Sequence, residues 1–160
     1  MLNKSKYFDF KNLVSLNDKV KISNFVGWSG LSITKFIIKK NTTINVDDIN
    51  EKFPFLIKKE KIFITIEGEI NFKTKNKIKK LEKFDVVDLN SGNHDFQINA
   101  QKKSTFFMIG AQKSRINKNK YKPYYFNFLD DFKSKNLWGG QIISRPYEGE
   151  NITLVLFDLK

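Results

Sequence analysis

The sequence predicts a single-domain, all-β protein folded as a sandwich or a closed barrel. Apolar and β-branched residues alternate with polar residues in several short runs, as in strands that bury one face. Turn-forming residues separate these runs about every ten residues, which is typical of antiparallel sandwiches and barrels. A chain of 160 residues is long enough to bury one hydrophobic core.

The first part of the chain moves from polar sequence into strands. Residues 1–19 are mixed and polar, which suits an arm or a short helix. The strand pattern begins at Val20, and Leu31–Ile38 alternates as a half-buried strand does. Residues 41–54 are interpreted as a loop that ends at Pro54.

The strongest strand pattern covers residues 62–72. The even-numbered positions around Gly68 are apolar and predict one continuous core face: Ile62, Ile64, Ile66, Ile70 and Phe72. The odd-numbered positions mix aromatic and polar groups, as the wall of a cavity does: Lys61, Phe63, Thr65, Glu67, Glu69 and Asn71.

The middle of the chain continues as short strands and turns. Residues 73–80 form a lysine-rich hairpin, which is either a solvated edge that discourages aggregation or a patch that tracks phosphates. Residues 86–89 form another short strand, and 90–95 form a turn by composition. Residues 95–100 and Ser104–Ala111 continue the strand rhythm.

Residues 116–138 break that rhythm. They begin basic and polar, are dense in aromatic residues around Pro123, and predict a linker followed by a short helix near 128–135. The aromatic side chains would cover the open side of a barrel or a dimer face, with base stacking as the alternative. The predicted organisation is a barrel with an N-terminal arm over residues 1–115, this linker with its short helix, and terminal strands over 139–160.

The terminal strands leave several arrangements open. Residues 30–40 and 150–160 both alternate and end in lysine, so they resemble each other. The terminal strands can complete their own barrel as an extra hairpin, pair with a second copy by strand exchange, or begin a second barrel module.

The composition limits the partners. The chain carries 29 Lys and Arg residues against 17 Asp and Glu, giving a net charge of +12, but its only arginines are Arg115 and Arg145. Sites that read nucleic acids favour arginine, so nucleic acid is not an expected partner. Lys, Asn, Ile and Phe all have AT-rich codons, so genome composition accounts for much of the charge.

Other function classes are excluded by what the sequence lacks. The chain has no cysteine, so it has no disulfide, cysteine-ligated zinc or thiol nucleophile. No run approaches the roughly 18 apolar residues of a membrane span, and the N-terminus lacks the apolar segment of a signal peptide. We therefore expect a cytoplasmic protein with no membrane partner.

Two stretches resemble the sequence motifs of the cupin superfamily, the RmlC-like jelly rolls. "TIEGEINF" resembles the end of the motif G-x5-H-x-H-x3,4-E-x6-G, with Gly68 as the last glycine. "FDVVDLNSG" resembles the motif G-x5-P-x-G-x2-H-x3-N, which matches at Gly92 and Asn99. The resemblance covers roughly residues 31–111. It implies a cupin-type double-stranded β-helix (jelly-roll) barrel, usually dimeric, with a ligand cavity. We expect the short helical, aromatic segment to follow this barrel.

The metal positions of both motifs are changed. Counting back from Gly68, the glutamate of the motif falls on Lys61, and its histidines fall on residues that cannot ligate a metal: Phe55 and Ile57, or Pro54 and Leu56. The second histidine position is Asp95, with His94 one residue early, and a slip of one residue turns a strand side chain to the other face. Lys61 would also repel a divalent cation by a few kcal/mol at an effective dielectric near 20. We expect a degenerate metal site and no cofactor.

The resemblance therefore implies a protein that binds a small organic ligand, such as a sugar or an organic acid, in the barrel without metal catalysis. Lys61 is the expected cation for a carboxylate or phosphate, and Phe63 an apolar wall. The expected ligand-binding residues are Lys61, Phe63, Thr65, His94, Asp95 and Asn99, with His94 and Asn99 as hydrogen-bonding groups near the mouth.

Two alternatives stay open. One is a cupin enzyme, an isomerase, an epimerase or a metal-dependent dioxygenase, that uses His94 with a displaced acid such as Glu60 or Asp95. The other is a scaffold or regulatory half-module whose active partner lies elsewhere.

Overall fold

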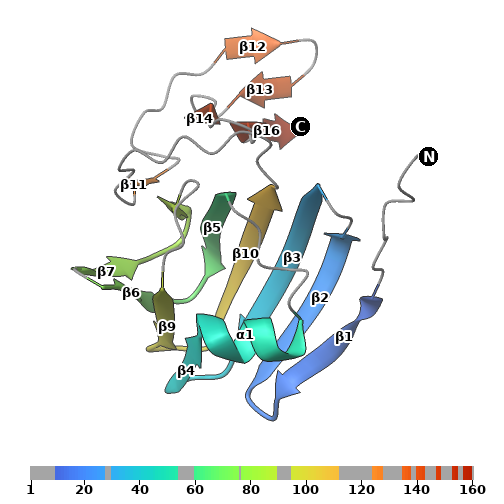
Figure 1. The fold of residues 1–160 in the computed structure, drawn as a ribbon. Coiled ribbons are helices and arrows are strands. Elements are labelled where there is room, and N and C mark those ends of the chain that lie inside the picture. Colours follow the sequence, from blue (N-terminus) through green and yellow to red (C-terminus); the bar gives the residue numbers. More distant parts are fainter. Residues whose placement is uncertain are drawn as a thin grey trace.

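Two antiparallel sheets pack against each other in the computed structural model (Figure 1). It describes residues 10–27, 30–53, 60–75, 77–89, 95–111 and 124–127, and short strands at 135–137, 140–142, 147–148, 153–154 and 157–159. The larger sheet has seven strands in the order β1-β2-β3-β10-β5-β8-β11, and the smaller has four in the order β4-β9-β6-β7.

The predicted all-β class is confirmed by these two sheets. The larger sheet contains β1 (Phe10–Asn17), β2 (Val20–Gly27), β3 (Leu31–Ile38), β5 (Glu60–Glu67), β8 (Asp85–Asp88), β10 (Ser104–Ala111) and β11 (Tyr124–Asn127). The smaller sheet contains β4 (Thr42–Asn45), β6 (Ile70–Thr74), β7 (Lys77–Leu81) and β9 (Phe96–Ala100). The bounds of β3 and β10 agree with the prediction from sequence.

The strand predicted over residues 62–72 is two strands, β5 and β6, that belong to different sheets. Between them Gly68 has a φ of +86°, a conformation that other residues rarely adopt. Ile62 therefore packs in a small cluster on the outer face of the larger sheet, whereas Ile70 packs in the core between the sheets. The prediction of one continuous core face was wrong because Gly68 turns the chain from one sheet into the other.

The N-terminal segment also differs from its prediction. Where an arm or a short helix was expected, β1 pairs antiparallel with β2 along the edge of the larger sheet. Val14 lies opposite Ile22 and packs against the core, so this edge strand contributes to the hydrophobic interior.

A short helix, α1 (Val46–Lys52), lies in the segment predicted as a loop. The Asp48 carboxylate accepts a 2.7 Å hydrogen bond from the backbone N–H of Asn45, half of a capping box, and Ile49 is buried in the core. Seven residues are too few for a clear helical period, which is why the pattern reads as a loop. In the part of the chain that the structure describes, no helix is long and apolar enough to cross a membrane.

Aromatic rings fill the space between the two sheets. The Phe63 ring centroid lies 4.9 Å from that of Phe96 and 5.0 Å from that of Phe72. Phe36 stacks on Phe106 with 4.7 Å between their centroids. These rings fill the middle of the barrel with apolar side chains.

The outward faces of the two sheets differ in character. On the smaller sheet, amide side chains form hydrogen bonds across strands, as when Gln97 Nε2 donates to Asn45 Oδ1 at 2.8 Å. On the larger sheet, the outward positions of β3 and β10 are mostly apolar and half-buried: Leu31, Ile33, Ile37, Phe107 and Ile109. The exposed aromatic Phe25 contacts Phe107 on this same face, with 5.8 Å between ring centroids.

The larger sheet continues beyond residue 115. Strand β11 pairs with β8, and Asn127 donates from Nδ2 to Asp85 Oδ1 at 2.7 Å. The sheet thus includes four residues of the segment predicted as a linker. The helix predicted near 128–135 lies outside the described residues, except Lys135, which begins β12.

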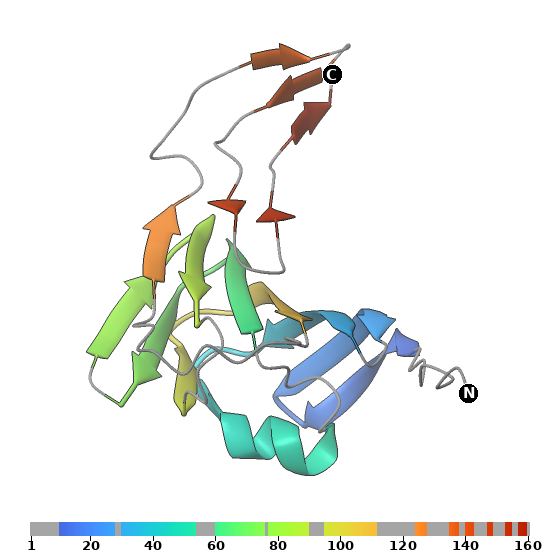
Figure 2. The same ribbon diagram turned by 45° about the horizontal axis from the view of Figure 1, so that its top comes forward.

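The remaining strands of the chain are short. They are β12 (Lys135–Leu137), β13 (Gly140–Ile142), β14 (Tyr147–Glu148), β15 (Thr153–Leu154) and β16 (Phe157–Leu159). β12, β13 and β16 form a three-stranded sheet, and β14 pairs with β15. In both views these strands lie to one side of the two barrel sheets (Figures 1 and 2).

Candidate ligand site

The inner face of the larger sheet becomes polar toward the end at which β5 begins. Strand register places inner residues of β3, β10 and β5 in three successive rows: Phe36, Phe106 and Thr65; then Thr34, Met108 and Phe63; then Ser32, Gly110 and Lys61. The last row lies one residue from the end of each strand. This last row carries no apolar side chain, and we call it the polar end of the barrel.

Strand β2 adds an amide to this polar end. Asn24 lies opposite Thr34, and its Oδ1 accepts a 2.9 Å hydrogen bond from the Thr34 hydroxyl. Asn24, Ser32 and Thr34 are each 0% exposed. Burying such groups costs free energy, so a cluster of them is a candidate for ligand recognition as well as for structure.

Lys61 is the strongest functional signal in the described chain. Its side chain is only 2% exposed, although lysine is rarely buried. Burial lowers the pKa of Lys61 from its usual 10.5 to about 8, because a low-dielectric environment disfavours the charged form. At neutral pH the group is still mostly a cation, so it can bind an anion.

Phe63 and Thr65 lie deeper in the barrel than Lys61. Phe63 forms the apolar floor beneath the lysine and belongs to the aromatic core. Thr65 is a further row away, opposite Phe106, and its buried hydroxyl has no hydrogen-bond partner among the described residues. The register thus brings Phe63 next to Lys61 but leaves Thr65 on the far side of that floor.

The residues predicted from the second motif do not gather at this end. His94 lies outside the described residues. Asp95 is exposed just before β9, and Asn99 alternates with the buried Ile98. Asn99 therefore faces outward, where its Nδ2 donates to Thr43 Oγ1 at 2.7 Å. Asn99 contributes to the polar outer surface of the smaller sheet.

The acid proposed for an enzyme site faces away from the barrel interior. Glu60 lies opposite Ala111, on the same outward face as Ile62. Among the described residues, no three His, Cys, Asp or Glu side chains lie close enough to hold a metal ion. The described residues at the motif positions thus do not fit an internal metal site, and we derive no step through a metal.

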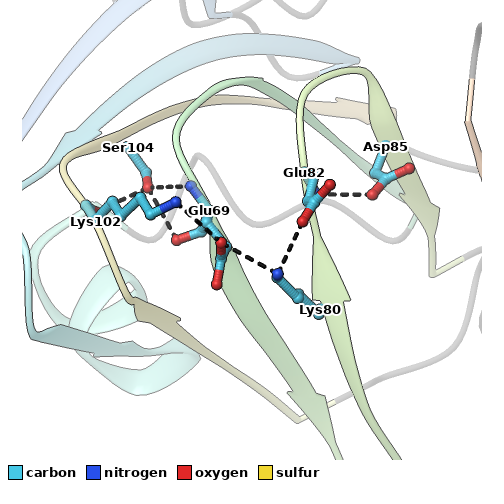
Figure 3. Close-up of polar contacts among 6 residues, drawn as sticks. All are labelled: Glu69, Lys80, Glu82, Asp85, Lys102 and Ser104. Carbon is cyan, nitrogen blue, oxygen red and sulfur yellow. Dashed lines mark hydrogen bonds and ion pairs between the residues drawn. The ribbon is translucent and has the colours of Figure 1, made fainter.

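The most cupin-like sequence, around Gly68 and Glu69, holds the opposite end of the barrel together (Figure 3). The Ser104 hydroxyl accepts a 3.0 Å hydrogen bond from the Glu69 N–H and lies 3.1 Å from the Glu69 carbonyl oxygen, to which it can donate. The Glu69 carboxylate pairs with Lys80 at 3.2 Å and Lys102 at 3.4 Å. These contacts, led by the bond to Lys80, lower the pKa of Glu69. The motif residues in this turn are structural.

Sequence reasoning missed Asn24, Ser32 and Thr34. In β3 both faces carry apolar residues, so alternation alone does not show which face turns inward. One signal was available in the sequence. Phe36 and Ile38 are large apolar residues at even-numbered positions of β3, so they indicate that Ser32 and Thr34, also at even-numbered positions, face inward.

Solved structures with a similar architecture include cupins. An RmlC-like cupin from Shewanella frigidimarina matches with a TM-score of 0.53 and 13% identity, over 69% of this chain and 95% of that one. Oxalate decarboxylase from Bacillus subtilis matches with a TM-score of 0.50 and 14% identity, over 69% of this chain and 30% of that one.

A third structure covers more of the chain. A glyoxylate induced protein from Pseudomonas aeruginosa matches with a TM-score of 0.61 and 10% identity, over 90% of this chain and 53% of that one. This chain thus spans about half the length of that protein. The chain matches no family model and no curated protein. At these identities the likeness concerns the fold: the chain has the cupin fold, an antiparallel jelly-roll barrel.

Proposed function

We propose that the protein binds a small organic acid at the polar end of its barrel, with Lys61 as the counter-charge for the carboxylate. The observation that carries this proposal is the burial of a lysine at 2% exposure in the last inner row of the sheet. Lysine is rarely buried in a protein, so a buried cation near the end of a barrel is a candidate for binding an anion.

The neighbouring groups suit a ligand with oxygen atoms. Ser32 shares the row of Lys61, and Thr34 lies one row deeper. Hydroxyl and amide groups can bind the carboxylate and hydroxyl oxygens of a hydroxy or oxo acid. Phe63 and Met108, in the next row, would contact its carbon atoms. One structural neighbour, oxalate decarboxylase, is named for a small dicarboxylate, which agrees with this ligand class.

Calorimetric titration with matched acid and neutral compounds tests the proposal. Gluconate and pyruvate should bind, and their neutral counterparts glucose and acetone should bind at least tenfold more weakly. A Lys61→Met variant should lose the preference for the acids, because removing one partner of a buried charged pair costs roughly 2 kcal/mol or more.

A second lysine serves as the control. Lys73 is exposed on β6, so Lys73→Met removes the same charge from the surface and should leave the titration unchanged. Equal binding of acids by the wild-type protein and Lys61→Met would contradict the proposal, as would equal losses in the two variants.

A further inference from the structure

We propose that Lys61 also acts as a nucleophile, capturing the carbonyl group of an oxo acid as an imine at the polar end of the barrel. This inference rests on the proposed function, since the same site is to hold the acid, and it narrows the ligand class to acids with an aldehyde or ketone group.

The geometry favours capture at this position. Lys61 lies directly opposite Gly110, which has no side chain to cover the amine from β10. The row is one residue from the strand ends, so Lys61 lies nearer to this end of the barrel than the aromatic floor at Phe63 does. Ser32, in the same row but two strands away on β3, places a second polar group on this face of the sheet.

The protonation state agrees with this chemistry. Only the neutral amine attacks a carbonyl, and burial lowers the pKa of Lys61 to about 8. At pH 8 about half of such a group is neutral, whereas an ordinary lysine with a pKa near 10.4 is neutral in only about 0.4% of molecules. Lys61 is therefore the better nucleophile wherever a carbonyl compound reaches it.

The reaction is balanced without a metal or an oxidant. The Nζ lone pair forms a bond to the carbonyl carbon, and the π electrons of the carbonyl move to its oxygen. A proton moves from nitrogen to that oxygen, and loss of one water molecule then gives the carbon–nitrogen double bond. Added cyanoborohydride delivers a hydride to the imine carbon and makes the adduct permanent.

Reductive trapping with pyruvate tests the inference in the wild-type protein. The protein is incubated with pyruvate and cyanoborohydride at pH 8, and modified lysines are located by mass spectrometry of peptides. Lys61 should be modified at least tenfold more than the exposed Lys73. Equal or lower modification of Lys61 would overturn the inference, and this comparison requires no variant to fold.

Two further outcomes separate this inference from the proposed function. If titration shows that pyruvate binds but Lys61 is not trapped, the imine inference fails and acid binding stands. If Lys61 is trapped to the same extent with acetone as with pyruvate, and titration shows no preference for acids, then Lys61 is a nucleophile but the proposed carboxylate site is wrong.

A Lys61→Arg variant separates charge from nucleophilicity. Arginine keeps the positive charge, but its guanidinium is not deprotonated in proteins. The variant should bind pyruvate within about tenfold of the wild type and show no trapping at position 61, with circular dichroism confirming its fold. Modification of the exposed Lys73 should be the same in the variant and in the wild-type protein. A loss of modification at Lys73 in the variant would count against the inference, because the substitution would then affect more than position 61.

Discussion

Lys61 of β5 and Gly110 of β10 face each other across the strand pair on the inner side of the larger sheet. The long cationic side chain of Lys61 therefore lies beside a residue that has no side chain. Both residues are near one end of the barrel, and phenylalanine rings fill its middle. The barrel interior thus has an aromatic core in its middle and polar side chains at this end.

Replacing Lys61 by methionine should stabilise the protein at neutral pH. Methionine has a similar length and no charge to desolvate, whereas the pKa shift of Lys61 from 10.5 to about 8 means that burial penalises the charged form. We expect the free energy of unfolding to rise by about 1–3 kcal/mol, measured by urea denaturation at pH 7.

The pH dependence of that difference gives a further check. Between about pH 8 and 10.5 the unfolded chain binds more protons at this lysine than the folded chain, so wild-type stability should rise with pH in that window. Lys61→Met should lack this rise, and the gap between the two proteins should narrow. A gap that stays constant from pH 7 to 10 would contradict the burial of a charged Lys61.

Thr65 and Thr34 form a matched pair for a second prediction. In the part of the chain that the structure describes, the buried Thr65 hydroxyl has no hydrogen-bond partner, so Thr65→Val should stabilise the protein by about 1 kcal/mol. The Thr34 hydroxyl donates to Asn24, so Thr34→Val should destabilise it by about 1–2 kcal/mol. Chemical denaturation of both variants measures the contrast, and effects of the same sign would show that the inner rows are assigned wrongly.

Gly68 should not tolerate a side chain. A Cβ there would lie 2.4 Å from the Lys103 carbonyl oxygen and from Ser104 Oγ, and the φ of +86° is strained for alanine. We expect Gly68→Ala to lower the free energy of unfolding by about 2 kcal/mol or more. Gly30→Ala, at an exposed position, is the control and should change stability much less.

The predicted homodimer can be tested on the outward face of the larger sheet. A second copy seated on this apolar face would cover Phe25 and Phe107, which contact each other there. Phe107→Ser should then shift the protein toward the monomer in light scattering, because it removes apolar area from the interface. Ile78→Ser is the control, since Ile78 is 63% exposed on the smaller sheet. Dimer loss in both variants, or in neither, would argue against this interface.

The sequence predicted the fold better than the site. Alternation located β3 and β10, and the turn-rich spacing indicated a barrel. Alternation could not show that Gly68 sends β5 and β6 into different sheets, since both strands are in phase across it. Helix α1 was missed because its signal is one capping residue and two buried apolar residues.

The candidate site depended on long-range pairing that no local pattern contains. Lys61 was identified because it replaces the glutamate of a motif, and its burial agrees with an internal position. Asn99 matched the same family pattern, yet pairing with β4 and β6 turns its side chain outward. Ser32 joins Lys61 only through the register of β10 with both neighbouring strands.

The most direct measurement is the pKa of Lys61 by NMR of the ¹⁵N-labelled side chain, with and without saturating gluconate. A bound carboxylate favours the charged lysine, so the pKa should be near 8 in the free protein and should rise on addition of gluconate but not of glucose. A Lys61 pKa that is the same in the presence and absence of gluconate would contradict an anion site at the polar end of the barrel.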